Sequence, residues 1–165
     1  MSSLDALAKF GAGAKPADLR RYFRGRWSLL RRIEDRRRDL PGTLLGEARF
    51  EDHATGLLYR ETGRLRLGHY DGRCHQSYFY GFPDAGRVEV RFADGRFFHA
   101  LDLTNDIAEA EHLCAQDHYR TRVELTGAHR WTSRWQVLGP AKDLILTTWY
   151  VRIGQAPTCH DADAP

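Results

Sequence analysis

Apolar and polar residues alternate strictly over many short runs of this 165-residue chain. Such alternation is typical of half-buried β-strands, in which successive side chains point to opposite faces of a sheet. Runs of this kind cover Trp27–Ile33, Leu44–Phe50, Leu57–Leu67, Tyr78–Phe82, Arg87–Phe92, Tyr119–Leu125, Trp131–Val137 and 143–153. Because such runs recur about every ten residues, we predict an antiparallel meander.

Glycine and proline pairs mark the predicted turns. These pairs are Pro41-Gly42, Asp71-Gly72, Asp94-Gly95 and Gly139-Pro140. Asp94-Gly95 lies between two alternating runs and predicts a hairpin. A meander of about eight to ten strands can bury its edges only by closing on itself. The sequence therefore predicts an all-β fold, a closed antiparallel up-and-down β-barrel.

The segments outside the alternating runs complete the predicted organisation. Pro16 and Asp18 suit the first turn of a short helix over 16–23, because proline fits there and an acid favours the helix dipole. Residues 103–112 break the alternation and predict a loop or a short helical turn. We expect one barrel domain over 16–153, between a loose N-terminal segment, 1–15, and a loose C-terminal tail, 154–165.

Composition and charge exclude several classes of protein. An apolar fraction of 42% is typical of globular chains, and no run approaches the roughly 20 apolar residues of a membrane span. Of the 25 basic residues 22 are arginine, and many of them fall between residues 20 and 38. Glu34, Asp35 and Asp39 interrupt that stretch, which favours a solvated turn over a nucleic-acid surface. We expect neither a membrane nor a nucleic acid as partner.

The cysteines and the first residues indicate the compartment. Cys74, Cys114 and Cys159 are an odd number at spacings that form neither a disulfide framework nor a zinc pair. Residues 1–15 lack the basic head and apolar run of a secretory signal. We therefore expect a reducing, cytoplasmic location.

Several polar residues occupy the same alternate strand positions as the apolar residues near them, and so point into the predicted barrel. They are Arg31, Tyr59, Glu61, Tyr78, Tyr80, Asp117 and Tyr119. Burying such groups is unfavourable unless they are paired or hydrated. One interpretation is a ligand cavity in which Arg31 holds a polar head and the tyrosines line the wall. The other is a brace, an ion pair of Arg31 with Glu61 or with Asp117.

The densest cluster of reactive residue types is His112-x-Cys114-x-x-Asp117-x-Tyr119. In an extended segment His112 and Cys114 lie on one face and could act as base and nucleophile. Alternatively, Cys114 is a small buried residue and His112 bonds a loop carbonyl. With His99 these residues could also bind a metal, but the spacing fits no established zinc motif, so we expect no metal. His99 suits acid or base chemistry because the pKa of histidine lies near neutrality.

Gly25-Arg26-Trp27, after the predicted helix, resembles the Gly-x-Trp motif that opens the first strand of lipocalins, within the calycin superfamily. The resemblance implies that Arg152 packs across Trp27 at the closed end of the barrel. Residues 20–152 also resemble a family of lipocalin-like domains from bacteria and fungi that has no established activity. The matching pieces are Trp27-x-x-x-Arg31-x-Ile33, Leu58-Tyr59-x-Glu61, Phe98-His99, the cluster from His112 to Tyr119, and Gly139-Pro140-x-Lys142-Asp143.

The expected function is binding of a small, partly apolar, anionic or carbonyl-bearing molecule inside the barrel. The candidate binding residues are Arg31, Tyr59, Tyr78, Tyr80, His112 and Cys114. The alternative follows from lipocalin-like proteins that are cofactor-free enzymes, such as decarboxylases, isomerases and dehydratases. By that analogy Glu61 or Asp117 is a general base, and His99 or a tyrosine such as Tyr119 is a general acid.

A bound heme is not expected either. Nitrobindins are heme-binding barrels of similar size, and their proximal histidine lies on a late strand. Residues 143–153 contain no histidine, which leaves His99, His112 and His129 as the heme ligands to consider. We therefore expect no cofactor, and the sequence leaves a homodimer open.

Overall fold

Ten antiparallel strands and one short helix make up the part of the chain that the computed structural model describes, residue 16 and residues 18–154. The predicted loose ends lie outside these residues, apart from Gly154. The elements are α1 (Leu19–Phe23), β1 (Gly25–Asp35), β2 (Leu40–His53), β3 (Gly56–Leu67), β4 (Tyr70–Asp84), β5 (Arg87–Phe92), β6 (Phe97–Asp102), β7 (Ile107–Cys114), β8 (Asp117–Gly127), β9 (Arg130–Gly139) and β10 (Lys142–Arg152).

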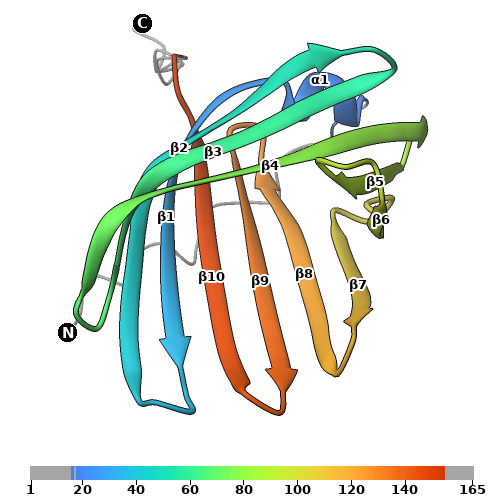
Figure 1. Cartoon of the computed structure of the whole chain (residues 1–165). Helices are drawn as coiled ribbons and strands as arrows, with labels where there is room; N and C mark the ends of the chain where they lie inside the picture. The colour runs from blue at the N-terminus through green and yellow to red at the C-terminus, as the bar shows by residue number, and fades with distance from the viewer. Residues whose placement is uncertain (1–15, 17, 155–165) are drawn as a thin grey trace, which may run out of the picture.

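All ten strands form a single curled sheet in the order β6-β5-β4-β3-β2-β1-β10-β9-β8-β7. Strands that follow one another in the chain pair, except β6 and β7, and β1 also pairs with β10, from Trp27 opposite Arg152 to Asp35 opposite Leu144. The two edge strands of the sheet are β6 and β7. They are not paired with each other by backbone hydrogen bonds, so the barrel has one open seam between them. Figure 1 shows the long strands β3 and β4 running across the upper ends of β1, β10, β9 and β8. The result is a nearly closed barrel, which confirms the predicted fold class.

Alternating side chains fill the inside of the barrel, as the sequence pattern requires. On β1, Trp27, Leu29 and Ile33 are buried, whereas the intervening Ser28, Leu30 and Arg32 are exposed. The outer arginines of this region pair with carboxylates, for example Arg26 with Glu47 at 2.8 Å. The Arg-rich stretch is therefore largely neutralised by exposed ion pairs, which are individually weak.

The closed end of the barrel is built around Trp27. Asp18 caps α1 by accepting a hydrogen bond from the backbone N–H of Arg21, and α1 buries Leu19, Tyr22 and Phe23. The indole of Trp27 donates to the Phe23 carbonyl at 2.8 Å. The Arg152 guanidinium lies 4.1 Å above the centre of the Trp27 ring and donates to the carbonyls of Arg24 and Tyr22. This is the arrangement that the lipocalin resemblance implied.

Three local predictions were wrong. The helix begins at Leu19 rather than at residue 16, because Asp18 stands before it as the cap. Residues 107–112 belong to β7, and the alternation is weak there because the inward positions carry the small residues Ala108 and Ala110. Pro41-Gly42 and Asp71-Gly72 lie inside strands β2 and β4, whereas the hairpin at Asp94-Gly95 is confirmed.

Gly42 lies where two neighbouring strands approach each other closely, and not in a turn. A Cβ atom at Gly42 would lie 2.8 Å from Leu67 Cδ1 and 2.9 Å from the Arg66 carbonyl oxygen. Glycine is therefore needed there so that β2 and β3 can pack together. Across the described residues, no helix is both long enough and apolar enough to span a membrane.

Replacing Arg152 with alanine should lower the free energy of unfolding by about 2 kcal/mol, because the stacking on Trp27 and two hydrogen bonds to carbonyls are lost together. Urea unfolding followed by circular dichroism measures this loss. The control is Arg64→Ala, which removes an exposed pair with Asp71 and should have an effect of about 1 kcal/mol or less. Equal effects of the two substitutions would contradict the role given to Arg152.

Candidate functional site

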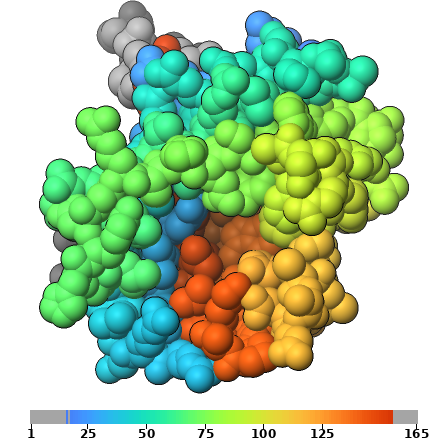
Figure 2. Space-filling model, in the orientation of Figure 1, coloured from blue at the N-terminus to red at the C-terminus, as the bar shows by residue number. Residues whose placement is uncertain are grey.

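The barrel encloses a cavity of about 270 Å³. In Figure 2 the surface is hollowed between the green β4 and the orange strands β8 to β10. The wall is mainly aromatic, and the aromatic side chains that line it are Phe23, Tyr59, Tyr78, Tyr80, Phe98, Tyr119, Trp131, Trp135 and Tyr150. Such a cavity suits a ligand that is small and largely apolar, since ligand pockets typically measure about 300–1,000 Å³.

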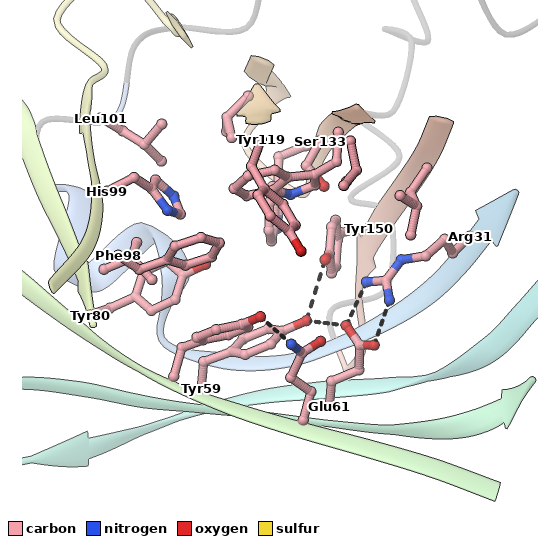
Figure 3. A pocket seen from close by; sticks show the side chains of 18 of the residues that line it. Arg31, Tyr59, Glu61, Tyr80, Phe98, His99, Leu101, Tyr119, Ser133 and Tyr150 are labelled. Carbon is pink, nitrogen blue, oxygen red and sulfur yellow. Dashed lines mark hydrogen bonds and ion pairs between the residues drawn. The ribbon is translucent and has the colours of Figure 1, made fainter. Parts of the chain in front are cut away.

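A buried ion pair forms the polar part of the wall (Figure 3). Arg31 on β1 donates to both oxygens of Glu61 on β3, at 2.8 and 2.7 Å. Tyr59 donates to Glu61 Oε2 at 2.5 Å, and its hydroxyl lies 3.3 Å from that of Tyr150. Arg31 Nε donates to Thr148 Oγ1 at 2.8 Å. We call these five residues the Arg31 network.

The Arg31 network is charged but compensated. The side chains of Arg31 and Glu61 are only 14% and 3% exposed. Burial alone would lower the pKa of Arg31, but Tyr150 and Glu61 act in the opposite direction and keep the pKa above its ordinary value. Burial raises the pKa of Tyr59 well above its ordinary value, with further contributions from Tyr150 and Glu61. Tyr59 therefore stays protonated and donates a hydrogen bond to Glu61.

Asp117 and Tyr119 lie at another part of the site with Lys142. Lys142 Nζ lies 2.5 Å from Asp117 Oδ2 and 3.3 Å from the hydroxyl of Tyr119. These hydrogen bonds raise the pKa of Lys142 to about 12. Lys142 and Tyr119 line the cavity, whereas Asp117 is not part of its wall. Of the two bracing pairs considered from the sequence, the structure contains Arg31–Glu61, and Asp117 pairs with Lys142 instead.

His99 on β6 is a buried base without a hydrogen-bonding partner at Nδ1. Its side chain lines the cavity and is 5% exposed, and its ring lies 4.5 Å from that of Phe98 and 5.1 Å from that of Trp135. Burial lowers the pKa of His99 to about 4, with a smaller contribution from His112. The imidazole is therefore neutral near pH 7 and stands in the wall of the cavity (Figure 3).

The cluster from His112 to Tyr119 does not converge on one site. His112 packs with its ring 5.0 Å from that of Phe98, but it is not part of the cavity wall. Cys114 is exposed at the end of β7, so it is neither buried nor close to the cavity. Within the described ranges, no three His, Cys, Asp or Glu side chains are grouped so that they could hold a metal ion.

Sequence reasoning missed several residues of the site. Thr148 and Tyr150 belong to the Arg31 network, and their shared parity with Arg152 on β10 was a usable signal. Trp131 also lines the cavity, and its place in an alternating run indicated only that it points inward. Lys142 lines the cavity as well, but its position two residues after Gly139-Pro140 gave no sign of a role in the site.

Comparisons with known proteins give the chain a family and a fold. The model of a family of unknown function, DUF6314, matches residues 23–152. No curated protein matches the chain. An S-type phycobiliprotein lyase, CPES from Guillardia theta, is similar in structure with a TM-score of 0.61 at 7% identity, over 84% of this chain and 92% of that one. The likeness shows a shared barrel fold, and lipocalin membership stays a prediction.

A redesigned β-barrel, mFAP1 bound to DFHBI, matches with a TM-score of 0.42 at 7% identity, over 80% of this chain and 96% of that one. A score this low does not establish a common fold.

Replacing Glu61 with glutamine should destabilise the protein by about 3–5 kcal/mol, because Arg31 then stays buried without a carboxylate. The double variant Arg31→Met/Glu61→Leu should recover most of this loss, since no charge is left buried. Urea unfolding of the single and double variants measures both effects. Glu51→Gln, which removes an exposed pair with Arg60, is the control. If Glu61→Gln lowered the free energy of unfolding no more than Glu51→Gln does, the Arg31–Glu61 pair would be dispensable for stability.

The stability of the protein should fall as the pH drops from about 6.5 towards 4. The unfolded chain takes up a proton at His99 near its ordinary pKa of 6.5, whereas the folded chain resists protonation until about pH 4. At pH 5 this difference amounts to about 2 kcal/mol. Thermal or urea unfolding between pH 7.5 and 5 measures the slope, and His99→Phe should flatten it. An unchanged slope in that variant would assign the pH dependence to other groups.

Proposed function

We propose that this chain, which belongs to the DUF6314 family of unknown function, binds a small, partly apolar, carbonyl-bearing molecule inside its barrel. The observation that carries the proposal is the aromatic cavity of about 270 Å³ with a preorganised polar network in its wall. A well-formed cavity with a few convergent polar groups is the usual form of a small-molecule site.

The state of Arg31 favours a carbonyl over an anionic group. Arg31 is the buried cation that would attract an anion, but both of its terminal nitrogens already donate to Glu61. Lys142 is likewise paired, with Asp117. A negative charge in the cavity would have to compete with these carboxylates, whereas a neutral carbonyl oxygen needs only a hydrogen-bond donor.

An acid/base enzyme is the second candidate, and the neutral imidazole of His99 in the cavity wall supports it. Glu61 accepts three hydrogen bonds and Asp117 is paired with Lys142, so both carboxylates are already engaged. The similar phycobiliprotein lyase does not decide between binder and enzyme, because its 7% identity supports the fold alone. A cytoplasmic location and a chain without metal or heme stay predictions from the sequence, and a homodimer stays open.

The purified protein should carry or accept a small ligand. Native mass spectrometry should show a mass excess that disappears on denaturation, or N-phenylnaphthylamine should gain fluorescence when it enters the apolar cavity. The substitution Ser133→Leu fills space between Trp131 and Trp135 on the cavity wall and should weaken binding of this dye about tenfold or more.

The matched control is Ser28→Leu, the same substitution at an exposed position of β1 on the outside of the barrel. It should leave binding of the dye unchanged. Equal binding to both variants, with both folded by circular dichroism, would mean that the dye does not occupy the cavity.

A further inference from the structure

Lys142 and Tyr119 lie together at the open end of the cavity. Lys142 is the first residue of β10, and Arg152, which packs on Trp27 at the closed end, is the last. Both Lys142 and Tyr119 line the cavity, and Lys142 Nζ lies 3.3 Å from the Tyr119 hydroxyl. The Lys142 side chain is 42% exposed, as expected at a mouth that opens to solvent. We call these two residues the donor pair.

The chemistry of the donor pair fixes the direction of its hydrogen bonds. An ammonium group has three N–H donors and no lone pair, so the Tyr119 oxygen accepts from Lys142. The hydrogen of the Tyr119 hydroxyl is then left over, and no acceptor among the described residues takes it up. Lys142 donates to Tyr119 and, at 2.5 Å, to Asp117, which leaves its third N–H. The donor pair therefore offers the cavity two hydrogen-bond donors.

The spacing of the donor pair suits a single acceptor atom. Hydrogen bonds to oxygen join heavy atoms about 2.7–3.0 Å apart. An oxygen at that distance from both donors forms a triangle whose third side is the 3.3 Å between Lys142 Nζ and the Tyr119 hydroxyl. A carbonyl oxygen has two lone pairs and can accept from both. Figure 3 shows Tyr119 reaching into the cavity with its hydroxyl toward the Arg31 network.

Asp117 and Gly139 hold the donor pair in place. Asp117 accepts from Lys142, and its carboxylate lies against the backbone of Gly139, the residue opposite Lys142 in the β9–β10 ladder. A Cβ atom at Gly139 would overlap Asp117 Oδ1 and lie 2.9 Å from its Cγ. A larger residue at 139 would therefore displace the carboxylate and release Lys142. The fold thus joins two motifs that are separate in the sequence, the cluster from His112 to Tyr119 and Gly139-Pro140-x-Lys142-Asp143.

We propose that the donor pair binds the carbonyl oxygen of a neutral aryl ketone, whose rings occupy the aromatic cavity and whose carbonyl lies at the open end. This inference rests on the proposed function and adds the class of carbonyl compound and the residues that bind it. A ketone accepts hydrogen bonds and brings no proton of its own, which suits a site that offers donors. Because Asp117 already balances the charge of Lys142, the neutral ketone binds better than a carboxylate.

Calorimetry with three naphthalene probes of similar size tests the ligand class. The probes are 2-acetylnaphthalene, 2-ethylnaphthalene, which lacks the carbonyl, and 2-naphthoate. The wild-type protein should bind 2-acetylnaphthalene more tightly than 2-naphthoate. Tyr119→Phe and Lys142→Met should each weaken binding of 2-acetylnaphthalene about tenfold, because one hydrogen bond is lost, and should leave 2-ethylnaphthalene unchanged.

The carbonyl stretching frequency of bound, isotope-labelled 2-acetylnaphthalene reports the contact itself. Infrared difference spectroscopy should place this frequency lower in the wild-type protein than in an apolar solvent, because donated hydrogen bonds weaken the C=O bond. In Tyr119→Phe and Lys142→Met it should rise toward the value in the apolar solvent. Gly139→Ala should raise it as well, without touching the ligand, because the displaced Asp117 no longer holds Lys142 in place.

Matched controls come from the same barrel. Tyr80→Phe makes the same change at a tyrosine of the cavity wall whose ring lies 6.1 Å from that of Phe23, at the closed end. Gly81→Ala adds a Cβ atom with no neighbour among the described residues nearer than 3.8 Å. Neither control should shift the carbonyl frequency. The proposal is overturned if the controls shift it as much as Tyr119→Phe and Lys142→Met do, if those two variants leave it unchanged, or if 2-naphthoate binds the wild-type protein more tightly than 2-acetylnaphthalene.

N-phenylnaphthylamine separates this proposal from the proposed function. If the dye binds but 2-acetylnaphthalene does not, or binds with the carbonyl frequency it has in an apolar solvent, the donor pair is not the contact and the binding function stands. If neither the dye nor any naphthalene probe binds, both are overturned. The frequency in the wild-type protein needs no variant, so the test does not depend on whether each variant folds.

Discussion

Burying Arg31 and Glu61 inside an aromatic barrel is unfavourable unless every charge and proton is matched, and much of the inner surface is arranged around that requirement. Glu61 receives the guanidinium and the Tyr59 hydroxyl, while Arg31 reaches Thr148 with its remaining Nε. These partners come from β1, β3 and β10, so one polar network ties together strands from both parts of the chain. Removing any residue of the Arg31 network would leave polar groups of the others without partners in an apolar surrounding.

The charges at the cavity wall are balanced within the protein. Around Arg31 and Lys142 the charges are paired, and a ligand gains little by competing for them. The buried arginine is therefore not by itself evidence that the ligand is an anion.

Alternation was enough to predict the barrel and the inward direction of Arg31, Glu61 and Tyr59, because the side-chain period of a strand leaves little freedom. It failed at β7, where Ala108 and Ala110 are too small to mark the inner face, and at Gly42, which the pattern could not distinguish from a turn glycine. The pattern also could not show which charged residues form ion pairs with each other. Whether Arg31 pairs with Glu61 or Asp117 depends on which strands become neighbours, and that is a property of the closed sheet.

The pairing of β1 with β10 has a consequence for how the protein folds. The sheet consists of two meanders, β1 to β6 and β7 to β10, joined by a ladder in which Trp27 faces Arg152. Contacts between residues so distant in sequence form slowly, because the intervening chain must first be ordered. Among the described strands β10 is made last, so the first meander is synthesised before its partner in the β1–β10 ladder. Until β10 pairs with β1, the apolar inner face of the first meander is exposed to aggregation.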